Sequence, residues 1–60
     1  MAKLADIRKA KGLSQRRLAK LSGVGHITIA RIETGGCDPR LSTVQALAKA
    51  LEVKISKLVD

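Results

Sequence analysis

The sequence contains few of the residues that catalysis or metal binding requires. His26 is the only histidine and Cys37 the only cysteine among 60 residues, so no zinc site can be built from thiolates. Two of the five acidic residues, Asp38 and Asp60, lie in a turn-forming segment or at the end of the chain. No serine–histidine–aspartate arrangement and no phosphate-binding GxxxxGK motif is present. We therefore expect no enzymatic activity, no metal and no other cofactor.

Cationic side chains are the chemistry that this sequence does provide. Twelve Lys and Arg residues against five Asp and Glu residues give a net charge of +7. A small domain with this charge is expected to bind polyanions. The alternative is a solvated surface that only keeps the chain soluble. Phe, Tyr and Trp are absent, which argues against the stacking platforms of single-strand binders.

The segment from Gln15 to Gly35 predicts two short helices joined by a tight turn. Ser14 precedes the first helix, which runs over about 15–22, and its hydroxyl can cap the helix N-terminus. Gly23 stands where a helix C-cap needs a left-handed residue. The second helix occupies about 25–34 and ends before a pair of glycines. This layout is a helix-turn-helix, in which the second helix enters the major groove of double-stranded DNA.

Helical spacing divides these two helices into inner and outer sides. The predicted inner residues are Leu18, Ala19 and Leu21 in the first helix, Val24 in the turn, and Ile29 and Ile32 in the second helix. Ile27 and Arg31, four residues apart, lie on the opposite side of the second helix.

The outer residues of the second helix differ in what they can recognise. Arg31 can give two hydrogen bonds to guanine O6 and N7, worth about 1–3 kcal/mol of discrimination, or it can be a solvated or phosphate-bound arginine. Ile27 can pack against a thymine methyl group or against a partner protein. His26 can donate to or accept from a base or phosphate, and Thr28 can donate to a phosphate or touch a methyl group. Nonspecific attraction is assigned to Lys11, Arg16, Arg17 and Lys20.

The rest of the chain predicts three further helices, which makes the fold an all-α bundle of five short helices. They cover residues 2–11, 42–51 and 55–59. Ser42 or Thr43 is the expected cap of the 42–51 helix. Val59 has no expected inner position, so the 55–59 end is a candidate dimer surface.

Two charged residues are expected to link helices. Arg8 adjoins the apolar stripe of the first helix, and Glu33 adjoins Ile32. An Arg8–Glu33 ion pair is one interpretation, and two independent surface charges are the other. Arg40 is the last residue of a predicted turn over 35–40, and beside the end of the second motif helix it either contacts phosphate or is a free loop arginine.

Length and composition limit the number of domains and the cellular setting of the protein. Sixty residues form one domain at most, so residues 1–60 are expected to be a single DNA-binding domain. No signal peptide and no membrane-length apolar run is apparent. A lone cysteine fits a reducing, cytoplasmic setting.

Three segments, GLSQRRLAKLSGV, ITIARIETG and LSTVQALAKALEV, resemble the Cro/phage-repressor (XRE-type) family and together cover Gly12 to Val53. The resemblance implies a five-helix, repressor-like transcription regulator of bacteria or phages, usually a dimer on a palindromic operator. It implies that His26, Ile27 and Arg31 face base edges. It further implies phosphate contacts by Gln15, which often braces a base-reading residue, and by Arg40, and a buried ion pair between Arg8 and Glu33.

The sequence departs from the family pattern at three positions. Gly25 replaces a usual Ser or Thr, which removes a hydroxyl cap and a backbone contact. Ile27 stands where many members have a polar residue that reads bases, and Gly36 stands where members often have Lys or Arg. These departures imply a weaker phosphate clamp and readout that depends less on hydrogen bonds.

Two rival functions remain open at this point. Many small members of the family are antitoxins, which bind a toxin protein as well as their own operator. Nonspecific polyanion binding driven by charge alone is the other, and it predicts no sequence preference at any salt concentration.

Overall fold

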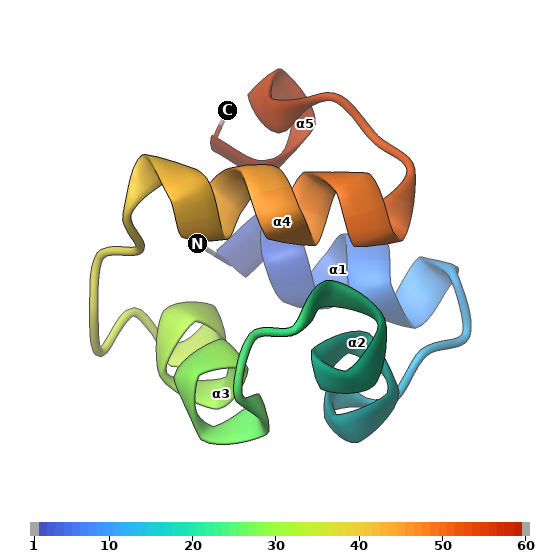
Figure 1. Ribbon diagram of the computed structural model, residues 1–60, viewed down its shortest axis with the longest axis horizontal. Coiled ribbons are helices and arrows are strands. Elements are labelled where there is room, and N and C mark those ends of the chain that lie inside the picture. The colour runs from blue at the N-terminus through green and yellow to red at the C-terminus, as the bar shows by residue number, and fades with distance from the viewer. Residues whose placement is uncertain (1, 60) are drawn as a thin grey trace.

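The computed structural model describes residues 2–59, and the regular structure in this range consists of five α-helices joined by turns, as expected. The helices are α1 (Ala2–Ala10), α2 (Gln15–Ser22), α3 (His26–Thr34), α4 (Leu41–Leu51) and α5 (Ile55–Val59). Figure 1 shows α4 lying across the molecule, with α1 behind it, α5 on one side and the α2–α3 pair on the other. The five-helix bundle measures 22 × 22 × 19 Å.

An aliphatic core fills the space between the helices. Its buried members are Leu4, Leu18, Ile29, Ile32, Val44, Leu47, Ala48, Leu51 and Leu58. Four of them come from α4 and lie on one side of that helix. Val53 and Ile55 pack against this core, so the α4–α5 end closes it. The side chain of Val59 lies outside the described residues.

Local backbone chemistry fixes the limits of α2. The Ser14 hydroxyl accepts a hydrogen bond from the Arg17 backbone N–H at 3.0 Å, which caps the N-terminus. Gly23 ends the helix in the left-handed region at φ 78°, and its N–H donates to the Ala19 carbonyl at 2.8 Å. Both predicted caps are confirmed, and the turn that they produce leads directly into α3.

Three details of the sequence-based prediction are wrong. The first helix ends at Ala10, with Lys11 already in the turn that follows. Helix α4 begins at Leu41 with Arg40 as its N-cap, so Ser42 and Thr43 lie inside the first turn, where their hydroxyls cannot take the capping position. Leu21 is 49% exposed, because it lies in the last turn of α2, just before the chain leaves the helix.

No helix within residues 2–59 combines the length and the hydropathy needed to cross a membrane.

Candidate nucleic-acid interface

Helix α3 has one fully buried side and one exposed side. Ile29 and Ile32 are 0% exposed and belong to the core. Ile27, by contrast, is 60% exposed, and Thr28 and Arg31 are exposed as well. The predicted separation of inner and outer residues is therefore confirmed. A helix whose inner side is fixed by the core can insert its exposed side into a groove of a partner such as double-stranded DNA.

The exposed stripe of α3 extends one turn further than the sequence analysis assigned. Thr34 is exposed and stands seven residues after Ile27, on the same side of the helix. Its hydroxyl donates to the Arg31 carbonyl at 3.1 Å. The helical spacing was the signal that could have identified it.

The first turn of α3 has no side-chain cap. Gly25 is the N-cap, and it supplies only its carbonyl, which accepts from Ile29 N–H at 3.0 Å. The expected loss of a hydroxyl cap is confirmed. His26 follows as the first residue of α3 and is half-buried.

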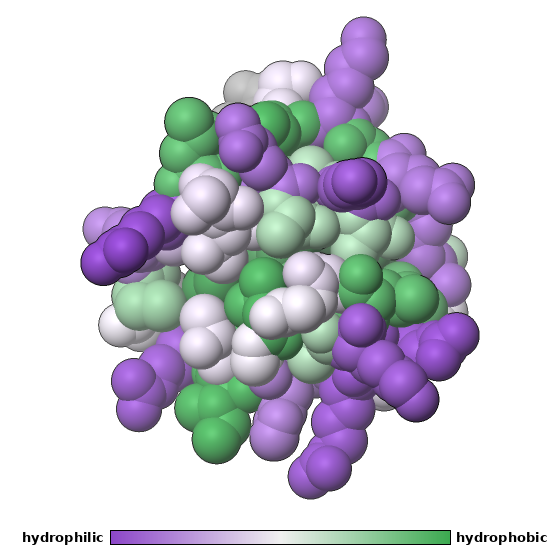
Figure 2. Space-filling model, in the orientation of Figure 1, coloured by the Kyte–Doolittle hydropathy of each residue, from purple (hydrophilic) through white to green (hydrophobic). Residues whose placement is uncertain are grey.

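Unpaired cations lie on α3 and on the chain segments that precede and follow it in sequence. The exposed basic residues predicted to attract DNA are Lys11 after α1, Arg16, Arg17 and Lys20 on α2, Arg31 on α3, and Arg40 before α4. Within residues 2–59 none of these side chains forms a hydrogen bond or ion pair. Figure 2 shows strongly hydrophilic side chains along the edge formed by α2 and α3. Their charges are thus available to an anionic partner.

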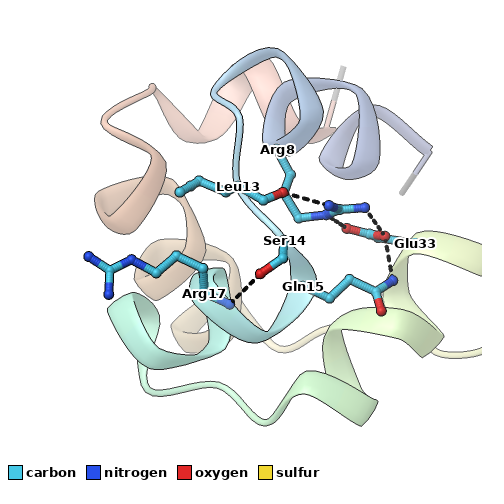
Figure 3. Close-up of polar contacts among 6 residues, drawn as sticks. All are labelled: Arg8, Leu13, Ser14, Gln15, Arg17 and Glu33. Atoms are coloured by element: carbon cyan, nitrogen blue, oxygen red, sulfur yellow. Dashed lines mark hydrogen bonds and ion pairs between the residues drawn. The ribbon is translucent and has the colours of Figure 1, made fainter.

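Arg8, Glu33 and Gln15 form a polar network that joins α1, α2 and α3 (Figure 3). Arg8 Nε donates to Glu33 Oε2 at 2.7 Å, and Arg8 Nη2 donates to Oε1 at 3.2 Å. Arg8 Nη1 also donates to the Leu13 carbonyl at 2.7 Å. The predicted ion pair is therefore confirmed, and it ties α1 and the chain before α2 to the end of α3.

Burial makes this ion pair sensitive to loss of either partner. The side chains of Arg8 and Glu33 are only 9% and 6% exposed. Burial raises the pKa of Glu33, but hydrogen bonds from Arg8 and Gln15, together with the charges of Arg8 and Lys9, outweigh burial and leave that pKa below its ordinary value. Glu33 is thus held as a carboxylate at neutral pH.

Gln15 takes part in this network, which the sequence analysis missed. Its Nε2 donates to Glu33 Oε1 at 2.9 Å, across 18 residues of sequence. The bond directs the amide nitrogen toward Glu33 and the amide oxygen away from it, as Figure 3 shows. One N–H and the oxygen of the Gln15 amide remain for other partners. The only sequence signal was the position of Gln15 at the start of α2.

Neither a pocket nor a cluster of metal-binding side chains is found among the described residues. No group of three or more His, Cys, Asp and Glu side chains within residues 2–59 could hold a metal ion. No pocket opens on this part of the chain. The candidate site is the exposed surface made by α2, α3 and Arg40.

These features define a class of protein. A capped helix, a glycine turn and a second helix with one buried and one exposed side constitute a helix-turn-helix domain.

Comparison with known proteins identifies the family more closely. Residues 4–58 match the helix-turn-helix family, and the chain belongs to it, as a domain of the Cro/phage-repressor (XRE) type. It is 44% identical over 55 residues to the HTH-type transcriptional regulator PuuR of Escherichia coli, which covers 92% of this chain and 30% of PuuR. It is 40% identical over 59 residues to the cryptic phage CTXphi transcriptional repressor RstR of Vibrio cholerae, covering 98% of this chain and 53% of RstR.

Two further similarities bear on the rival functions. Antitoxin HigA1 of Mycobacterium tuberculosis is 37% identical over 57 residues, covering 95% of this chain and 38% of HigA1. The crystal structure of the restriction-modification controller protein C.AhdI of Aeromonas hydrophila superimposes with a TM-score of 0.91 at 38% identity, covering 93% of this chain and 85% of that one. The chain spans between about a third and about a half of the curated relatives it matches.

Proposed function

We propose that this chain is a sequence-specific, double-stranded DNA-binding domain that regulates transcription as a repressor. The observation that carries the proposal is the exposed stripe of α3, which lies directly opposite its two fully buried isoleucines and is bordered by unpaired cations. A helix held in this way can enter a major groove without rearrangement. PuuR and RstR, a transcriptional regulator and a transcriptional repressor by name, support this function.

Each side chain of the surface has a role in the proposal. His26, Ile27 and Arg31 face base edges, with Arg31 donating two hydrogen bonds to a guanine. The phosphate contacts are assigned to Gln15, Arg16, Arg17, Thr28 and Arg40. For Gln15 the remaining amide N–H is the donor, because the other N–H is held by Glu33. Arg8 and Glu33 fix the position of α3 and do not touch DNA.

The proposal extends to assembly and setting. A homodimer with two copies of α3 about one DNA turn apart would read a palindromic operator, and the 55–59 end is the candidate contact between copies. Residues 1–60 would act as one DNA-binding domain in a bacterial cytoplasm or on phage DNA.

Selection from a randomised duplex library at about physiological salt tests this function. We expect a two-fold symmetric motif, and Arg31→Ala should relax one base position in each half. Lys20→Ala is the matched control, since it removes a cation from α2 and should weaken all sequences alike. About six phosphate contacts should give a slope of log affinity against log salt near −5. Failure of any sequence to be enriched would contradict sequence-specific binding.

Similarity to HigA1 supports a second candidate function, in which the chain also neutralises a toxin protein. That role predicts relief of the growth arrest caused by the product of a neighbouring gene. Arg31→Ala should preserve the relief if the toxin and DNA use different surfaces. Absence of relief with every neighbouring gene product would leave DNA binding as the function.

A further inference from the structure

Ile27 is the part of the α3 surface that attraction between charges does not explain. It is 60% exposed in the first turn of α3 and is not among the apolar residues that pack against the core. A single exposed apolar side chain is ordinary on a protein surface, so exposure alone carries no conclusion. Its position is what matters, because Ile27 shares one side of α3 with Arg31.

Arg31 sets the scale of the contact. Its guanidinium has no partner within residues 2–59, so its full set of donors is free. Four residues along an α-helix correspond to about 6 Å. Successive base pairs are about 3.4 Å apart. Groups bound by Ile27 and Arg31 should therefore lie within about two base pairs of each other.

The surroundings of Ile27 restrict what can cover it. Thr28 and Arg31 beside it are exposed, and the basic residues of α2 have no acidic partner in the described chain. Such a surface favours a polyanion over a neutral or basic protein. In a DNA major groove the apolar group that a base pair presents is the 5-methyl group of a pyrimidine.

We propose that Ile27 binds a pyrimidine 5-methyl group located within about two base pairs of the guanine that Arg31 reads. This inference rests on the proposed DNA-binding function and specifies the ligand chemistry of its apolar contact. Isoleucine has no hydrogen-bonding group, so it distinguishes a methyl group from hydrogen and does not distinguish the bases themselves. Thymine supplies the methyl group in unmodified DNA, and 5-methylcytosine supplies the same group in methylated DNA.

Base analogues in the enriched duplex separate this contact from every other one. Each thymine is replaced in turn by deoxyuridine, which removes only the methyl group. One buried carbon of this kind is worth about fourfold in affinity. We expect one position in each half-site to show this ratio between thymine and uracil, and 5-methylcytosine at that position to bind better than cytosine by a similar factor.

Variants of the protein then assign the ratio to a residue. Ile27→Ala should bind the thymine and uracil duplexes equally, and Ile27→Val should show an intermediate ratio. Leu21→Ala, which shortens another exposed apolar side chain, and Arg31→Ala should both keep the thymine–uracil ratio of the parent. Circular dichroism should show that Ile27→Ala is folded, because alanine is a good helix former at an exposed position.

The outcomes distinguish the two proposals. A ratio that persists in Ile27→Ala, or the absence of any thymine whose methyl group matters, would overturn the methyl contact and leave sequence-specific binding intact. A methyl-sensitive thymine more than two base pairs from the Arg31-dependent guanine would also overturn it. If the library enriches no sequence, DNA reading fails, and the methyl contact fails with it. A ratio that disappears only in Ile27→Ala would establish the contact.

Discussion

Glu33→Gln is the smallest change that removes the negative charge from the Arg8–Glu33–Gln15 network. It keeps the shape of the side chain but leaves the Arg8 guanidinium, 9% exposed, without a counterion. Losing one partner of a buried ion pair costs about 3–5 kcal/mol. Arg8 retains its bond to the Leu13 carbonyl and can still donate to the new amide oxygen, so we expect about 3 kcal/mol.

The loss is large compared with the stability of a domain of this size. Natural domains are stable by about 0.05–0.15 kcal/mol per residue, which gives about 3–9 kcal/mol for this chain. A loss of 1 kcal/mol lowers the Tm of a small domain by about 4–8 °C, so Glu33→Gln should lower it by about 12–24 °C. Asp6→Asn, the same neutralisation at an exposed position of α1, should change stability by less than about 0.5 kcal/mol.

Urea unfolding followed by far-ultraviolet circular dichroism at pH 7 is the suitable assay, since no aromatic residue is present for fluorescence. Arg8→Met and the double variant complete a thermodynamic cycle. We expect the double variant to be more stable than the sum of the single effects predicts. It should not regain the parent's stability, because the Leu13 carbonyl loses its hydrogen bond from Arg8. If Glu33→Gln and Asp6→Asn cost the same, the network does not hold α3.

Three further predictions use the same unfolding and binding measurements. Folding lowers the pKa of Glu33, so the stabilisation by its carboxylate is complete above the ordinary carboxyl range and is lost as pH falls through the folded-state pKa. The free energy of unfolding should therefore decrease less steeply with falling pH in Glu33→Gln than in the parent. Gly25→Ser should stabilise the domain by about 0.5–1 kcal/mol, because serine can cap α3 and restricts the unfolded chain. The backbone allows it, since φ is −59° and the atom nearest to a new Cβ, Thr28 Oγ1, is 3.8 Å away. Gly23→Ser is the control and should destabilise the domain, because φ is 78° there. Gly36→Lys has room for its Cβ, which would lie 3.5 Å from the Arg31 carbonyl oxygen. A new phosphate contact should make the slope of log affinity against log salt steeper by about 0.9. An unchanged slope would place this turn away from the DNA backbone.

Much of the fold followed from the sequence because the relevant physics is local. Glycine at a left-handed position and serine before a helix determine where α2 ends and begins, whatever lies around them. The spacing of Ile29 and Ile32 similarly decides which side of α3 is buried. The Arg8–Glu33 pair could be proposed because each residue adjoins an inward-facing apolar one.

The failures occurred where the outcome depends on neighbouring elements. The sequence predicts an apolar side of α2 that contains Leu18, Ala19 and Leu21, but it does not tell how far the contact of α2 with the core extends. Leu21 lies beyond that contact. The first residue of α4 depends on the conformation of the preceding 35–40 turn. Arg40 therefore occupies the N-cap position that was expected for Ser42 or Thr43. The Gln15–Glu33 hydrogen bond depends on the angle between α2 and α3, which no local pattern determines.

The structure keeps the support of α3 separate from its exposed stripe. Glu33 and Ile32 hold the helix from within, while Arg31, next to them in sequence, points outward and contributes nothing to the core. Substitutions at Ile27 or Arg31 should therefore change which DNA is bound with little effect on stability. Substitutions at Arg8 or Glu33 should act in the opposite way, lowering stability and, in the folded fraction, weakening all sequences alike. A domain built in this way can acquire a new operator by changing exposed residues one at a time, because none of those changes disturbs the contacts that orient the helix.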